Sequence, residues 1–130
     1  MGTKYQDSTP QVKIWTVGAP NKPHAYYTWG YDTVLITFKV AEGITGGRVA
    51  FEGYMGFKYD DDKEWGDWFP IGGVDTAYPA SESVREYDLT EGSAAFWCKT
   101  IGFSNFQVRA VEALEGSGSV QIGLACHAGV

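Results

Sequence analysis

The sequence predicts an all-β protein, a single antiparallel β-sandwich or jelly-roll-like domain of about eight or nine strands. Three observations support this class. Short segments of alternating apolar and polar residues recur along the chain, turn residues separate them, and no segment has the period of an amphipathic helix. The 17 glycines agree with this class, because tight turns and bulges need residues without a Cβ atom.

The first half of the chain is predicted to form four strands, at residues 11–17, 24–29, 33–40 and 48–55. In the first, Val12 and Ile14 alternate with Lys13 and Trp15. Two prolines place the following residues in a loop, because proline fixes φ and lacks a donor. The third segment is dense in β-branched side chains, which favour strands. Residues 43–47 are predicted to form the turn before the fourth.

The longest predicted irregular segment covers residues 56–66 and includes three consecutive aspartates. A strand opens at residues 68–71 and breaks at two glycines. Four further strands are predicted at residues 83–89, 94–101, 106–114 and 119–127.

The last two predicted strands show the clearest alternation in the chain. Phe106, Val108 and Ala110 alternate with polar residues in one strand, and Val120, Ile122 and Leu124 do so in the other. Residues 115–118 contain two glycines and a serine, which tolerate the positive φ of tight turns, so we predict a hairpin between the two strands.

Residues 1–10 are predicted to form a polar N-terminal arm, and residues 11–130 are predicted to form the β-sandwich domain.

Composition limits the classes of function. The net charge of −6 argues against a nucleic-acid-binding protein, which needs a basic face for phosphates. The chain has no apolar run of the roughly 20 residues that span a bilayer, so no membrane partner is predicted. The N-terminus lacks the apolar segment of a signal peptide, which predicts a protein that is made in a cytoplasm without a recognisable export signal.

No residue pattern predicts catalysis, a cofactor or a metal. His24 and His127 have no recognisable nucleophile beside them. Cys126 and His127 are adjacent, so strand geometry points their side chains to opposite faces and disfavours joint zinc ligation. The acidic residues 60–67 do not match the glycine spacing of a calcium loop and are better interpreted as a solvated hairpin tip. We therefore predict a non-enzymatic protein.

The two cysteines are predicted to be buried thiols. Cys98 is in phase with Phe96, and Cys126 is in phase with Leu124. A disulfide between them is left open, because the sequence does not give the distance between their strands.

Aromatic residues are the one marked excess in the composition. Adjacent pairs such as Tyr26-Tyr27 and Phe96-Trp97 place one ring on each face of a strand, so one member of each pair is predicted to face outward. Exposed tyrosine and tryptophan mark a protein interface or a platform for stacking sugars. The candidate interface residues are Tyr26, Tyr27, Trp29, Trp65, Trp68 and Trp97.

Three motifs, taken together, resemble a β-sandwich module of virion proteins from tailed bacteriophages. They are Gly47-Arg48-Val49-Ala50-Phe51-Glu52-Gly53, Asp67-Trp68-Phe69-Pro70-Ile71, and residues 102–111 with the following residues 118–122. The resemblance covers about residues 34–125. This chain departs from the family in the long acidic connection between the first two motifs, and in Gln107, where an arginine is common.

The resemblance implies a structural role in a virion, with no catalytic or ligand residue to transfer. The first hypothesis is a capsid decoration (cement) protein that is made in the host cytoplasm, binds the major capsid protein and forms a trimer or dimer. Its anchors would lie near Tyr26, Tyr27, Trp29 and Trp97. The alternative is a tail, baseplate or fibre component, including an adhesin whose Trp65 and Trp68 bind carbohydrate.

Overall fold

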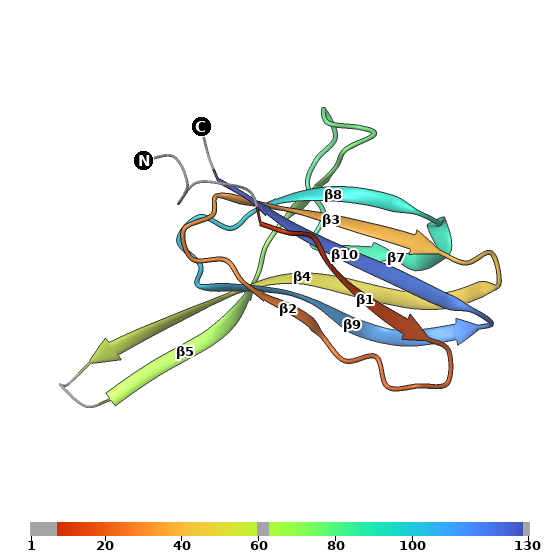
Figure 1. The fold of residues 1–130 in the computed structure, drawn as a ribbon, viewed down its shortest axis with the longest axis horizontal. Coiled ribbons are helices and arrows are strands. Elements are labelled where there is room, and N and C mark those ends of the chain that lie inside the picture. The colour runs from red at the N-terminus through yellow and green to blue at the C-terminus, as the bar shows by residue number, and fades with distance from the viewer. Residues whose placement is uncertain (1–7, 60–62, 129–130) are drawn as a thin grey trace.

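The chain is described by a computed structural model, which covers residues 8–59 and 63–128. Within these residues, ten strands form two antiparallel sheets that pack as a sandwich, and no α-helix is present (Figure 1). The strands are β1 Gln11–Thr16, β2 His24–Tyr27, β3 Thr33–Val40, β4 Ile44–Tyr59, β5 Lys63–Pro70, β6 Gly73–Asp75, β7 Glu86–Asp88, β8 Ala94–Lys99, β9 Asn105–Gly116 and β10 Ser119–His127. The predicted fold class is confirmed.

The two sheets interleave strands from both halves of the chain. Sheet A has the order β1-β10-β3-β8-β6, and sheet B has the order β2-β9-β4-β5, with β7 paired to β4. A single 3-10 turn, Leu89–Glu91, follows β7 in the described part of the chain. The Asp88 carboxylate caps this turn by accepting a 2.9 Å hydrogen bond from the Thr90 amide. The strand predicted at residues 83–89 is therefore shorter in the structure, where β7 covers Glu86–Asp88.

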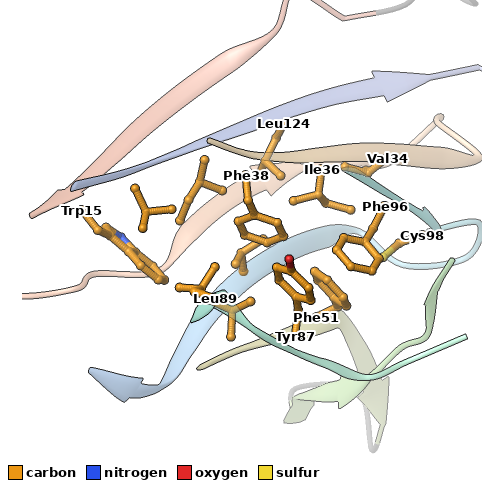
Figure 2. Packing of buried hydrophobic residues seen from close by; sticks show 14 of the residues in the cluster. Trp15, Val34, Ile36, Phe38, Phe51, Tyr87, Leu89, Phe96, Cys98 and Leu124 are labelled. Atoms are coloured by element: carbon orange, nitrogen blue, oxygen red, sulfur yellow. The ribbon is translucent and has the colours of Figure 1, made fainter. Parts of the chain in front are cut away.

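The core lies between the sheets and is built around four aromatic rings. Phe38 and Phe96 come from sheet A, and Phe51 and Tyr87 come from sheet B (Figure 2). Their ring centroids lie 4.8–6.2 Å apart in tilted, stacked and edge-on pairs, which is the range of favourable aromatic contacts.

The inward rows of the last two strands are as predicted, but the hairpin between them is wrong. Phe106 and Val108 in β9, and Val120, Ile122 and Leu124 in β10, are fully buried. However, β9 pairs with β2 and β4, whereas β10 pairs with β1 and β3. Residues 117–118 therefore cross from one sheet to the other. Both strands point an apolar row into the same core. Alternation within a strand does not show whether its neighbour in sequence pairs with it in one sheet or packs against it from the opposite sheet, and this is why the hairpin prediction failed.

The segment at 56–66 is not irregular. It forms the ends of β4 and β5, which pair from Glu52↔Pro70 to Tyr59↔Lys63, and its tip, residues 60–62, lies outside the described residues. The predicted turn at 43–47 is also displaced, because β4 already begins at Ile44 and bulges instead of ending. Gly47 adopts φ 139° among these bulges, a conformation that favours glycine.

In β1, the row that contains Trp15 faces inward. Trp15 is buried, and its Nε1 donates a 2.7 Å hydrogen bond to the carbonyl of Lys22, which holds the loop before β2 against the core. Val12 and Ile14 therefore face solvent and are 62% and 58% exposed. At the end of the predicted arm, Ser8 hydrogen bonds to the backbone of Cys126, whereas residues 1–7 lie outside the described residues.

The two cysteines are buried and free, as predicted for thiols in phase with core residues. Cys126 in β10 and Cys98 in β8 lie on either side of β3, where both pair with Val34. Two strand spacings separate their Cα atoms by about 9.6 Å, which exceeds the roughly 7 Å that a disulfide can bridge. The possibility left open by the sequence is therefore excluded in this fold.

Both thiols are expected to resist Ellman's reagent at pH 8 in the native protein and to react fully in denaturing urea. Burial raises the pKa of Cys126 to about 11 and raises that of Cys98 further, so the reactive thiolate is scarce. Reaction is followed by absorbance, with the single variants C98S and C126S as controls. Rapid reaction of the native protein would contradict this prediction.

Candidate interaction surfaces

The outer face of sheet B is charged, and its charges are paired. Glu52 lies between two donors from β9, accepting 2.9 Å hydrogen bonds from Nε and Nη2 of Arg109 and a 2.8 Å bond from Nε2 of Gln107. The bond from the Arg109 guanidinium is the main reason that the pKa of Glu52 lies below its usual value. Gln107 thus supplies a neutral donor to this carboxylate.

A second ionic cluster lies farther along the same face. Arg48 in β4 is 3.5 Å from the Asp88 carboxylate, 3.7 Å from that of Glu112 and 3.9 Å from that of Glu86. All four side chains are more than a third exposed, so these pairs orient the strands more than they stabilise them.

The outer face of sheet A is different, because apolar and small residues dominate it. One row across four strands is wholly apolar: Ala125, Leu35, Trp97 and Val74. The neighbouring row carries no charge: Val12, Gly123, Thr37 and Ala95. Beyond it lie Ile14, Gln121 and Lys39. We call these three rows, together with Lys99, the sheet A face.

Trp97 is the aromatic centre of the sheet A face. It is 40% exposed, whereas its neighbour Phe96 is buried, as the alternation predicted. The indole ring meets the ring of His127 edge-on, with centroids 5.1 Å apart, so it lies over β3 between the two strands that carry these residues. This contact holds the ring in one orientation on the sheet.

The Tyr26-Tyr27 pair in β2 also divides as predicted. Tyr26 is partly buried against the core, whereas Tyr27 is 61% exposed on the outer face of sheet B. Register places Tyr27 opposite Asn105 in β9, and Asn105 opposite Tyr54 in β4.

Trp29 lies in the loop that joins β2 to β3 (Figure 1). It is 61% exposed and lines a shallow depression with Tyr31 and Ile101. Backbone hydrogen bonds from Thr28 to Ser104 (2.8 Å) and from Thr100 to Asp32 (2.8 Å) hold this loop in place. Trp29 is therefore exposed on a loop that backbone hydrogen bonds hold in place.

Trp65 and Trp68 lie on the ribbon formed by β4 and β5, which extends away from the sandwich (Figure 1). Their spacing of three residues places them on opposite faces, and each has a different aromatic neighbour. The Trp65 ring lies 6.0 Å from Phe69, and the Trp68 ring lies 5.3 Å from Tyr54. The structure therefore does not bring the two tryptophans into one platform.

The sequence did not single out several residues of these surfaces. Val12 and Ile14 join the sheet A face because Trp15 takes the inward row, and Leu35 because it alternates with Val34 and Ile36. The alternation is visible in the sequence, but only the burial of Trp15 in the core decides which row is exposed. Tyr54 and Phe69 lie in the predicted strands 48–55 and 68–71, but the residues between these strands were predicted to be irregular, so the pairing of β4 with β5 was missed.

The two histidines lie on different sheets and form no catalytic pair. His24 is buried, and its Nε2 lies 3.1 Å from the Gln11 carbonyl. Burial lowers the pKa of His24, so the neutral ring links β2 at the edge of sheet B to β1 at the edge of sheet A.

A cleft of about 400 Å³ beside β7 contains carboxylates, including those of Asp75 and Glu82. Among the described residues, no group of three or more acidic, histidine or cysteine side chains is arranged to hold a metal ion. In the same residues, no helix is long and apolar enough to cross a membrane.

Comparison with known proteins identifies the fold. No family model and no curated protein matches the sequence. Among solved structures, the SPBc2 prophage-derived protein YomS has a TM-score of 0.58 and 9% identity, and the match covers 92% of this chain and 95% of YomS. The fold is shared with a prophage-derived protein. The PBSX exported protein XepA has a TM-score of 0.54 and 15% identity, and the match covers 91% of this chain but only 39% of XepA. At these identities the likeness is one of fold alone.

Proposed function

We propose that this chain is a non-enzymatic structural protein of a phage virion, and that it is a capsid decoration (cement) subunit. It binds and stabilises the shell of the major capsid protein, is made in the host cytoplasm, and acts as a dimer or trimer. The sequence resemblance to phage virion modules and the fold shared with YomS support the phage origin. The observation that carries the decoration role is the projecting ribbon of β4 and β5.

The ribbon is a two-stranded arm attached to the sandwich. β9 pairs with β4 only as far as Tyr54↔Asn105, so β4 beyond Tyr54 pairs with β5 alone. Two-stranded ribbons are only marginally stable in water, so docking would stabilise this one. Trp65 and Phe69 are 47% and 37% exposed on one of its faces. The sandwich and the projecting ribbon can contact two neighbouring shell subunits at once. Bridging neighbouring subunits in this way is how a cement protein stabilises a shell.

The test is co-sedimentation of the purified protein with capsids that lack it, together with its native mass. We expect saturable binding at a fixed ratio to the major capsid protein. The double variant W65A/F69A should bind at least tenfold more weakly, because aromatic anchors supply much of the energy of an interface. The matched control is V111A, which removes an exposed apolar side chain from the body. Wild-type protein that does not bind capsids would overturn the proposal.

A tail, baseplate or fibre adhesin is the second candidate, and one observation favours it. Tyr27, Asn105, Tyr54 and Trp68 form a row across the four main strands of sheet B. Such a row of rings with one amide can stack and orient sugars. Binding of the wild-type protein to host polysaccharide, lost in W68A but kept in W65A, would favour this function over decoration.

A further inference from the structure

The sheet A face combines an apolar centre with positive charge at its borders. Only two of its side chains carry formal charge, and both are lysines: Lys39 at one end of β3, and Lys99 at the opposite end of β8. Both side chains point outward and are exposed, and Leu35 and Trp97 lie between them along the strands. The face has no carboxylate.

This placement contrasts with the outer face of sheet B. The chain carries a net charge of −6, and on that face Arg48 and Arg109 pair with four carboxylates, those of Glu52, Glu86, Asp88 and Glu112. Among residues 8–59 and 63–128, no acidic group lies within salt-bridge distance of Lys39 or Lys99. An acidic protein thus presents an uncompensated positive, apolar face.

The face is large enough for a specific interface. Five strands at about 4.8 Å spacing span about 19 Å, and the eight residues of β3 span about 26 Å, which together give roughly 500 Å² of flat area. One partner in a standard protein interface buries about 800 Å² of accessible surface. Protruding side chains make the accessible surface of the sheet A face larger than its flat area, so its size is close to that value. Trp97, held by His127, supplies a central aromatic anchor of the kind that dominates binding energy.

We propose that the sheet A face docks on an acidic protein surface, one with an apolar centre and carboxylates opposite Lys39 and Lys99. This inference rests on the proposed function, and it assigns that surface to the capsid shell. Charge complementarity of this kind guides association and sets orientation, while the apolar row supplies the contact. Nucleic acid is a poorer partner, because two lysines neutralise few phosphates and the rest of the chain repels them.

The test uses the full-length chain and the same capsids. The variant K39E/K99E reverses two charges on the face, and K22E/R85E reverses two exposed charges elsewhere as the matched control. We expect at least tenfold weaker capsid binding for K39E/K99E and for W97A, and less than a twofold change for the control. Circular dichroism and thermal melts establish that all variants are folded.

The outcomes separate the two proposals. If wild-type protein binds capsids and K39E/K99E and W97A bind equally well, the docking face is elsewhere and this inference is wrong, while the decoration function stands. If wild-type protein does not bind capsids, the decoration function and the inference both fail. If wild-type protein instead sediments with phosphatidylserine vesicles and K39E/K99E does not, the face recognises anionic lipid and the inference is overturned.

Discussion

Replacing Phe51 with alanine is expected to lower the free energy of unfolding by about 3–5 kcal/mol, a large part of the stability of a typical domain. Phe51 is fully buried in β4, and its ring lies 5.3 Å from that of Phe96 and 6.2 Å from that of Phe38, both in the opposite sheet. The substitution therefore removes a contact that joins the two sheets. It also leaves a cavity that the surrounding strands cannot close without shifting.

Urea denaturation measures this effect, with the slope of the transition compared between variants to establish that only stability has changed. The variant F51L should lose less, about 1–2 kcal/mol, because it keeps most of the buried volume. The matched control V111A truncates an exposed residue in the neighbouring strand and should cost less than about 1 kcal/mol. Equal losses for F51A and V111A would show that Phe51 does not join the sheets.

Replacing Glu52 with alanine is expected to lower the free energy of unfolding by about 2 kcal/mol at pH 7. The change removes a bidentate pair with Arg109, whose side chain is 44% exposed and so contributes modestly. It also leaves the amide of Gln107 buried without its acceptor, and an unsatisfied buried donor costs more than the bond itself contributes.

The Glu52 contribution is expected to depend on pH. Hydrogen bonding to Arg109 lowers the pKa of Glu52 below its usual 4.5, so the unfolded state takes up the proton first as the pH falls. The contribution of the ionised Glu52 side chain to stability is complete above pH 4.5. It is lost as the pH falls through the lower pKa that Glu52 has in the folded state. Wild-type protein should therefore lose more stability than E52A between about pH 5 and pH 3.

Thermal melts of both proteins across this pH range provide the measurement. The control is E112A, because Glu112 is 60% exposed and its 3.7 Å contact with Arg48 should contribute less than about 0.5 kcal/mol. Parallel pH profiles for wild-type protein and E52A would contradict the assigned role of Glu52.

The strand periodicity predicted the fold class and much of the core. Phe96, Cys98 and Cys126 were placed inside by phase alone, and the split of Tyr26 and Tyr27 between two environments followed from adjacency. These predictions succeeded because strand geometry alternates faces whatever the neighbouring strand is.

The pairing of strands is harder to predict from the sequence than the inward-facing rows. The glycines and acidic residues of the β4–β5 ribbon have low strand propensity, and the ribbon forms because β4 provides a template for β5. Register also explains why Trp65 and Trp68 fail to form one platform: three residues along a strand reverse the face.

The alternation of apolar and polar residues predicts a sandwich of strands, buried cysteines and one outward-facing ring in each aromatic pair. Three features depend on how the strands pack: β9 and β10 belong to opposite sheets, Val12 and Ile14 lie on the surface, and the exposed lysines of sheet A border an apolar row. Alternation is a property of one strand, whereas a surface is assembled from several. Which rows become neighbours depends on strand order and register, and these are set by contacts between residues far apart in the chain.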